Sequence, residues 1–231
     1  MARFESFGMK LYKLNKVILQ IKNNVAQFLQ GLTSNDLDKP QNTFVNINGR
    51  IIATFDQLRI SDDEFIILVE ERFVDGLLNH IDKFVKLSAV KIERLKKNVY
   101  FDLDGNTKLE ANDHCIPQKK GRLLITDQVL QVHVSQEEFT LFRLKNNIPV
   151  QGIDYTDDFI LNVSQDFVSF TKGCFLGQEP IAKVHHRSKP SWKLLVKYED
   201  ECTLEEKPKM TSKVVEPQTR RVLGFIFLKN D

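Results

Sequence analysis

The stretch Lys172-Gly173-Cys174-Phe175-Leu176-Gly177-Gln178-Glu179 combines a thiol, two glycines, a lysine, an amide and a carboxylate. That combination of residues is not typical of a core strand or of a surface helix. Gly173 and Gly177 free the backbone for positive φ or for close approach of another group. Lys172 precedes the thiol by two positions and would favour the thiolate if the two side chains converge. The stretch therefore predicts either a thiol site or a tight turn around a buried cysteine that acts as a small hydrophobe.

The residue after this stretch is Pro180, which has no backbone N–H and disfavours a helical conformation at Glu179. We therefore expect Glu179 to be extended and the loop to end there.

The composition is that of a soluble globular protein. The chain has 231 residues, of which 42% are hydrophobic and 28% are charged. The net charge of +2 provides no overall field that would recruit nucleic acid or a membrane. The three cysteines (Cys115, Cys174 and Cys202) are far apart, which argues against a disulfide framework and for a reducing compartment. No signal peptide or membrane helix of ~20 apolar residues is evident, so we predict a cytoplasmic protein without direct nucleic-acid or membrane contact.

The first 96 residues alternate between strand-like and helix-like patterns. Asn48-Gly49 is a strong hairpin signal between two of the strands. The apolar positions between residues 73 and 85 have helical spacing. The resulting order, β-α-β-β-β-α-β, resembles a split β-α-β unit with an added strand. This predicts an α+β fold with mostly antiparallel sheets and helices on one face.

The rest of the chain adds strands and a second, smaller unit. Further strands are predicted at 99–103, 122–125, 129–134, 192–198 and 222–228. Residues 135–144 are predicted to form a helix with a Ser135/Glu138 capping box. Residues 150–168 show little periodicity and predict a long structured loop that leads to Cys174. The last two strands predict a small C-terminal β-rich subdomain that must pack on the main domain, because it is too short to bury a core alone.

The histidines next to the thiol loop are candidates for metal ligands and for catalytic bases. His185 and His186 would point apart on a strand, and no cysteine or carboxylate lies at metal-ligand spacing from them, so no metal site is predicted. Either histidine could serve Cys174 as the base of a hydrolase, but no third group is evident to orient it.

Phe139 and Arg143 are four residues apart on the predicted 135–144 helix and share a face. An aromatic ring beside a guanidinium suits a flat, anionic heteroaromatic ligand. The alternative is a core phenylalanine beside a surface arginine.

Two segments carry a family resemblance. Residues 148–154 (IPVQGID), followed by 169–179 (SFTKGCFLGQE), closely resemble the YgfZ-type folate-binding family, whose signature has the form K-G-C-aromatic-x-G-Q-E. That family is related to the glycine-cleavage T-protein, an aminomethyltransferase that uses tetrahydrofolate. Residues 28–36 and the hairpin at 48–52 resemble the N-terminal segments of the family.

The resemblance implies a T-protein-like fold around a folate cavity and a role in iron–sulfur cluster assembly or repair, linked to tRNA modification. It implies that Cys174 is the functional thiol, framed by Lys172, Gly173, Gly177, Gln178 and Glu179, and that Phe139 and Arg143 contact tetrahydrofolate. Iron–sulfur proteins would be the partners. By this comparison, residues 1–187 form the folate-binding domain (a split β-α-β part at about 1–96 and a shortened second part at about 97–187), and residues 188–231 form the C-terminal β subdomain.

One departure from the relatives bears on activity. T-proteins supply a catalytic aspartate after the hairpin glycines, and here the resemblance places Ala53 at that position. A conventional enzyme is therefore less expected than an accessory protein. Two alternatives stay open: a folate-dependent aminomethyl transferase with a rearranged acid, and an interaction module without a ligand.

Overall fold

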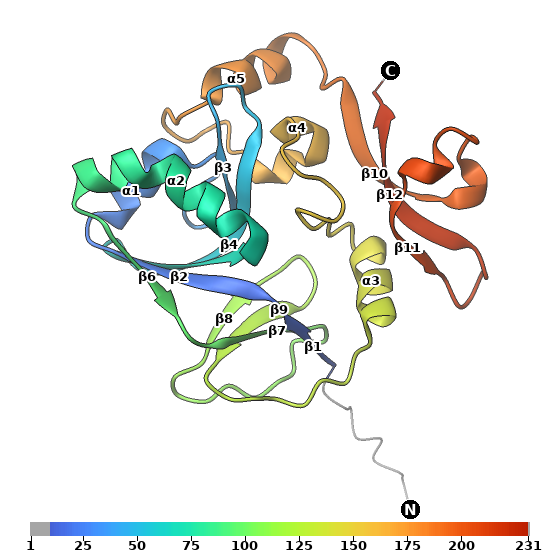
Figure 1. Ribbon diagram of the computed structural model, residues 1–231, viewed down its shortest axis with the longest axis horizontal. Coiled ribbons are helices and arrows are strands. Elements are labelled where there is room, and N and C mark those ends of the chain that lie inside the picture. The colour runs from blue at the N-terminus through green and yellow to red at the C-terminus, as the bar shows by residue number, and fades with distance from the viewer. Residues whose placement is uncertain (1–9, 231) are drawn as a thin grey trace, which may run out of the picture.

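Three antiparallel sheets, arranged around a common centre, make up the fold of residues 10–230, the part of the chain that the computed structural model describes (Figure 1). No helix within these residues combines the length and the apolar composition needed to cross a membrane.

The five-stranded sheet forms the N-terminal half, with the strand order β3-β4-β5-β2-β6. Its strands are β2 (Lys16–Lys22), β3 (Gln41–Val45), β4 (Ile51–Ser61), β5 (Glu64–Glu70) and β6 (Lys91–Leu95). The turn between β3 and β4 has Gly49 at φ 72°, which a residue without a Cβ adopts at least cost. Two helices, α1 (Val25–Leu32) and α2 (Glu71–Ser88), cover one face, and their buried apolar residues share a core with that face.

A four-stranded sheet packs against the opposite face of the first sheet, in the order β1-β7-β9-β8. Its strands are β1 (Leu11–Leu14), β7 (Asn98–Asp102), β8 (His114–Pro117) and β9 (Arg122–Thr126). The core between the two sheets includes Ile18 and Leu68 from the first sheet and Phe101 from the second. Phe139 of α3 (Gln136–Lys145) closes this core.

The C-terminal sheet has the order β10-β12-β11 and lies beyond α3 (Figure 1). Between α3 and this sheet the chain forms α4 (Ile160–Val163), the 3-10 helix η1 (Gln165–Phe167) and α5 (Gln178–Arg187). The sheet consists of β10 (Trp192–Tyr198), β11 (Thr211–Val215) and β12 (Val222–Lys229), with two short 3-10 helices, η2 (Glu199–Glu201) and η3 (Lys207–Lys209), before β11. Phe225 of β12 belongs to one buried cluster with Val45 of β3 and Ile160 of α4, so this sheet packs on the main body.

The predicted fold class is confirmed: the sheets are antiparallel, α1 and α2 cover one face of the largest sheet, and a small sheet ends the chain. The capping box is also confirmed, because Ser135 Oγ accepts the Glu138 N–H and the Glu138 carboxylate accepts the Ser135 N–H. The domain boundary after residue 187 stays a prediction.

Two local predictions are wrong. Residues 129–134 form no strand, since their backbone N–H groups at His133 and Val134 both bond to one carbonyl, that of Leu11, instead of forming a ladder. The predicted loop at 150–168 contains α4 and η1. Both pieces are too short to show a helical period in the sequence.

A buried ion pair joins α3 to the loop after it and to the C-terminal sheet. Arg143 Nη1 lies 2.8 Å from Asp154 Oδ2, and the two side chains are 5% and 0% exposed. Arg143 Nη2 also donates to Ser212 Oγ of β11, at 2.8 Å. Asp154 accepts further hydrogen bonds from Val150 N, Thr211 Oγ1 and Ser212 Oγ. The carboxylate therefore holds three segments that are distant in sequence.

Replacing Arg143 by methionine should destabilise the protein by about 3–5 kcal/mol, because it leaves the Asp154 carboxylate buried without its cation. Urea denaturation measures this loss. The control is Arg94→Met, which breaks the exposed pair between Arg94 and Asp75 and should cost less than about 1 kcal/mol. Equal effects of the two substitutions would contradict the role given to the buried pair.

Candidate functional site

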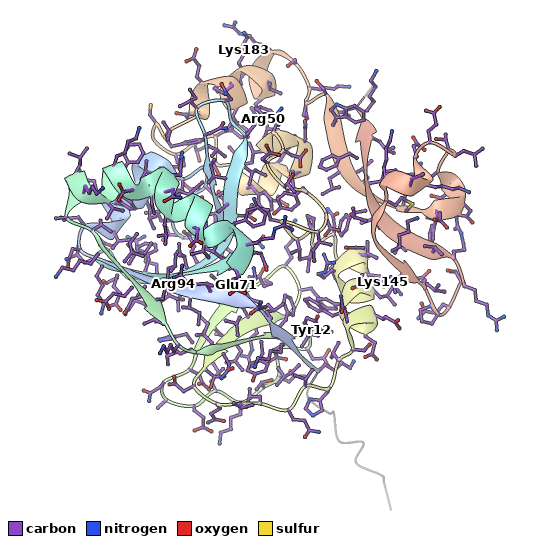
Figure 2. The ribbon with its side chains drawn as sticks, in the orientation of Figure 1. Tyr12, Arg50, Glu71, Arg94, Lys145 and Lys183 are labelled. Atoms are coloured by element: carbon purple, nitrogen blue, oxygen red, sulfur yellow. The ribbon has the colours of Figure 1, made fainter. Side chains whose placement is uncertain are left out.

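A cavity of about 280 Å³ lies where the first two sheets, α3 and the loop after α3 meet. Its wall includes residues of β1 and β2, of β3 and β4, of α3, and of the segment 148–155. Figure 2 shows Tyr12 of β1, one of the wall residues, in the lower half of the molecule. The cavity is thus formed by elements that are distant in the sequence.

Aromatic rings form one part of the cavity wall. Tyr12 stacks on Phe139 with ring centroids 4.1 Å apart and an angle of 13° between the planes. Phe101 lies against the same phenylalanine, at 5.3 Å. All three line the cavity. Phe139 is only 6% exposed, so Tyr12 covers much of the ring that the sequence predicted as a ligand contact.

Arg143 also lines the cavity, but its guanidinium is already engaged. Besides Asp154 and Ser212, it donates to the carbonyl of Ile148 at 3.2 Å. Asp154 balances its charge. Phe139 and Arg143 therefore both line the cavity, while Arg143 offers a ligand no unbalanced positive charge.

The opposite part of the wall carries a charged cluster that the sequence did not single out. Lys16 Nζ lies 2.9 Å from Asp56 Oδ2 and 3.1 Å from Glu70 Oε1. Burial lowers the pKa of Lys16, but the charges and hydrogen bonds of Asp56 and Glu70 outweigh burial and raise it above its usual range. Lys16 is thus held as an ammonium inside the cavity.

A neutral network stands next to this cluster. Gln151 Oε1 accepts the Thr54 N–H at 2.8 Å, and Thr54 Oγ1 lies 2.8 Å from the Tyr155 hydroxyl. Burial is the main cause of a raised pKa of Tyr155, which keeps the phenol protonated. All three residues line the cavity.

Alternation along β4 explains the position of Ala53. Ala53 is fully buried in the core shared with the helices and does not line the cavity, whereas Thr54 and Asp56 do. The position that the sequence comparison singled out thus faces away from the cavity. The signal in the sequence was Asp56, the one acidic residue of β4, between the apolar Phe55 and the polar Gln57.

The stretch 172–179 lies apart from the cavity, as a loop against the end of α1. Lys172 Nζ donates to the carbonyls of Thr33 and Asn35, which follow α1. The ammonium also lies 5.2 Å from the centre of the Phe175 ring. Burial lowers the pKa of Lys172 to about 8, although the charge of Asp36 partly opposes this. Lys172 therefore anchors the loop, and its hydrogen bonds go to carbonyls rather than to Cys174.

Cys174 is exposed at the tip of this loop, and it does not line the cavity. Gly173 beside it is also exposed. The buried Phe175 and the hydrogen bond from Leu176 N to Gly31 O fix the loop after the thiol, and Lys172 fixes it before the thiol. Of the two interpretations of the sequence, the structure excludes the buried cysteine. The loop presents a thiol to solvent on a firm support.

The end of the loop differs from the prediction. Glu179 is not extended: Gln178, Glu179 and Pro180 form the first turn of α5, whose N-cap is Gly177 at φ 82°. Proline is accepted there because the first N–H groups of a helix have no partner within it.

The two histidines are likewise on α5 and not on a strand. His185 stacks on Phe170 with centroids 3.6 Å apart, and His186 meets the same ring edge-on. Within residues 10–230, no three histidine, cysteine or acidic residues are grouped so that they could hold a metal ion.

None of the residues 172–179 lines the cavity. Figure 2 shows Lys183 of α5, the helix at the end of the loop, at one end of the molecule, and Tyr12 of the cavity wall in the opposite half. The thiol loop and the cavity are two separate sites.

The sequence of the chain is similar to those of several known proteins. No family model matches the chain. An uncharacterized protein of Haemophilus influenzae is 22% identical over 179 residues, which cover 71% of this chain and 64% of that protein. Mitochondrial proteins named iron–sulfur cluster assembly factor IBA57 homolog, from Mycosarcoma maydis and Dictyostelium discoideum, are 24% and 23% identical. Each match covers 76% of this chain, and 54% and 60% of the respective relative.

Among solved structures, glycine cleavage system aminomethyltransferase T from Bartonella henselae superimposes with a TM-score of 0.73 at 12% identity. The match covers 96% of this chain and 78% of that one. The chain thus has a T-protein-like fold and is similar in sequence to the IBA57 homologues. It spans between 54% and 64% of the length of the curated relatives that it matches.

The glycine at the N-cap of α5 gives a test of how firmly this T-protein-like chain holds its loop. A Cβ at Gly177 would lie 2.2 Å from the Asn46 carbonyl oxygen, and φ is positive. Gly177→Ala should therefore lower the free energy of unfolding by about 2 kcal/mol or more. In the control Gly173→Ala the added Cβ meets no atom closer than 3.7 Å, and the variant should stay within about 0.5 kcal/mol of wild type. Urea denaturation measures both variants, and a Gly177→Ala variant as stable as wild type would contradict the close packing of this glycine.

Proposed function

We propose that the chain is a folate-binding accessory protein that supports the assembly or repair of iron–sulfur clusters in other proteins, and through them tRNA modification. The observation that carries the proposal is the exposed thiol of Cys174 on a loop that Lys172 and Phe175 fix to α1. Two relatives bear the name of iron–sulfur cluster assembly factors, which supports the same function.

A thiolate is the usual protein ligand of iron–sulfur clusters. Cys174 is accessible to another protein, and no second cysteine or histidine stands with it in a metal-binding group within residues 10–230. A single thiol cannot hold a cluster alone. We therefore assign Cys174 a role in contact with a client iron–sulfur protein, with Lys172, Gly173, Gly177, Gln178 and Glu179 as its frame.

The cavity is proposed to bind tetrahydrofolate. Its volume of about 280 Å³ and its aromatic wall suit the flat pterin ring. Phe139 would contact the ligand together with Tyr12, which stacks on it. Arg143 would contribute N–H groups that its protein partners leave unused, since a guanidinium has five. The fold of the Bartonella aminomethyltransferase, a member of the class that the sequence comparison associates with folate, supports this assignment.

An aminomethyl transferase is the second candidate, because the cavity does contain carboxylates, those of Asp56 and Glu70. Asp56 accepts hydrogen bonds from Lys16, Gln41 and Gln118, and Glu70 faces the Lys16 ammonium, so both carboxylates already pair with groups of the protein. We therefore favour the accessory role over turnover.

Calorimetric titration with tetrahydrofolate tests the ligand. We expect saturable one-to-one binding with a Kd below about 1 mM. p-Aminobenzoyl-glutamate, which lacks the pterin ring, should bind at least about tenfold more weakly, because stacking and the polar contacts belong to that ring. No binding of tetrahydrofolate up to this concentration would remove the cofactor from the proposal and favour a ligand-free interaction module.

Complementation tests the thiol. In cells lacking the endogenous protein, Cys174→Ala should restore less than about a tenth of the activity of client iron–sulfur enzymes, because the exposed ligand is gone. The matched control Cys115→Ala, which changes a half-buried cysteine on β8, should restore it. Thermal unfolding confirms that both variants are folded. Full rescue by Cys174→Ala would contradict the role of the thiol.

A further inference from the structure

The cluster of Lys16, Asp56 and Glu70 is a charged group within the cavity that the folate contacts assigned to Phe139 and Arg143 do not explain. The three side chains line the cavity and are 15%, 6% and 22% exposed. Removing charges from water is costly unless partners compensate. One cation and two anions on the wall of a cavity are therefore better suited to a polar ligand than to an apolar one.

Hydrogen-bonding capacity shows which of these groups are available. Asp56 already accepts three hydrogen bonds, from Lys16, Gln41 and Gln118. Lys16 has three N–H bonds and uses two of them, on Asp56 and Glu70. Within residues 10–230, Glu70 Oε1 faces the ammonium and Oε2 accepts no hydrogen bond. A spare donor on Lys16 and a spare acceptor on Glu70 therefore lie side by side.

We propose that Lys16 and Glu70 form a subsite that recognises the amide-like edge of a flat heterocycle, in which a ring N–H adjoins a ring carbonyl. The ammonium donates to the carbonyl oxygen, and the Glu70 carboxylate accepts from the ring N–H. The pterin ring carries such an edge, so the inference rests on the proposed folate binding and adds the orientation of the ring. Its polar edge faces β2 and β5, and the Tyr12–Phe139 wall supplies the apolar contact.

This subsite also predicts specificity. A site that pairs a buried donor and acceptor with a ligand rejects an analogue that cannot complete the pair, since its own groups are then left unsatisfied. The ring N–H is the group to remove. Folic acid and its derivative methylated at N3 differ only there.

Calorimetry with these two ligands tests the inference on the full chain. Wild type should bind N3-methyl folic acid at least about tenfold more weakly than folic acid. Glu70→Leu removes the acceptor and should reduce both the affinity for folic acid and the discrimination between the ligands by about tenfold. Glu70 makes no side-chain cap on α2, so the substitution removes no helix cap. The matched control is Glu71→Leu, the adjacent residue, which bonds Asn15 and does not line the cavity.

The possible outcomes separate the two proposals. Absence of tetrahydrofolate binding to wild type up to about 1 mM overturns both. Binding of tetrahydrofolate without binding of folic acid overturns the subsite alone, because both ligands carry the same ring edge. Binding that is insensitive to N3 methylation, or equal in wild type and Glu70→Leu, overturns the subsite alone. Thermal unfolding checks each variant. Should Glu70→Leu fail to fold, Glu70→Gln, which keeps the size and loses the charge, must show a weaker but parallel loss for the inference to stand.

Discussion

The buried pair of Arg143 and Asp154 is the interaction on which the arrangement of the sheets depends. It joins a helix, the loop that follows, and a strand of the C-terminal sheet through one carboxylate. Without it, the packing of β11 beside α3 would leave an ionised group in the protein interior, at a cost of several kcal/mol. The cavity wall includes both α3 and this loop, so the same pair that closes the fold also shapes the cavity.

The buried pair with Asp154 changes the role that Arg143 can have toward a ligand. An arginine on the wall of a ligand cavity suggests an anion site. Here, however, the charge of Arg143 is balanced by Asp154 within the protein. The unsatisfied polar capacity of the cavity lies on the other side, at Lys16 and Glu70, where opposite charges stand together. A cavity built this way favours a neutral ring with a polar edge over a simple anion.

Much of the fold follows from local sequence patterns. The hairpin at Asn48-Gly49, the helix at 73–85 and the capping box at Ser135 each depend on a few neighbouring residues, and the structure has all three. The polar cluster could not be found in this way. Lys16 and Asp56 are 40 residues apart and meet because β2 and β4 both pair with β5. When two side chains meet only because their strands pair in a sheet, the sequence near each of them shows no more than a charged residue within a strand.

The thiol site could be predicted only in part, because its geometry also depends on contacts between residues that are distant in the sequence. The glycines and the cysteine indicated either a thiol site or a tight turn around a buried cysteine. Which of the two forms, and whether Lys172 bonds the thiol or the backbone near α1, depends on residues that are distant in the sequence. In the structure, Lys172 donates hydrogen bonds to the backbone carbonyls of Thr33 and Asn35 and not to the thiol. The lysine in the motif thus fixes where the thiol is presented.

The two sites share one physical connection. The carbonyl of Asn35 accepts a hydrogen bond from Lys172 and another from Asn42, each at 3.1 Å, and Asn42 lines the cavity. A contact path of this kind is not coupling in itself, because coupling requires a ligand that favours one of two arrangements. A ligand that binds only the native cavity stabilises the native state by mass action and, with it, this buried carbonyl. Folate would then support the thiol loop by holding its anchor in place, without ever approaching Cys174.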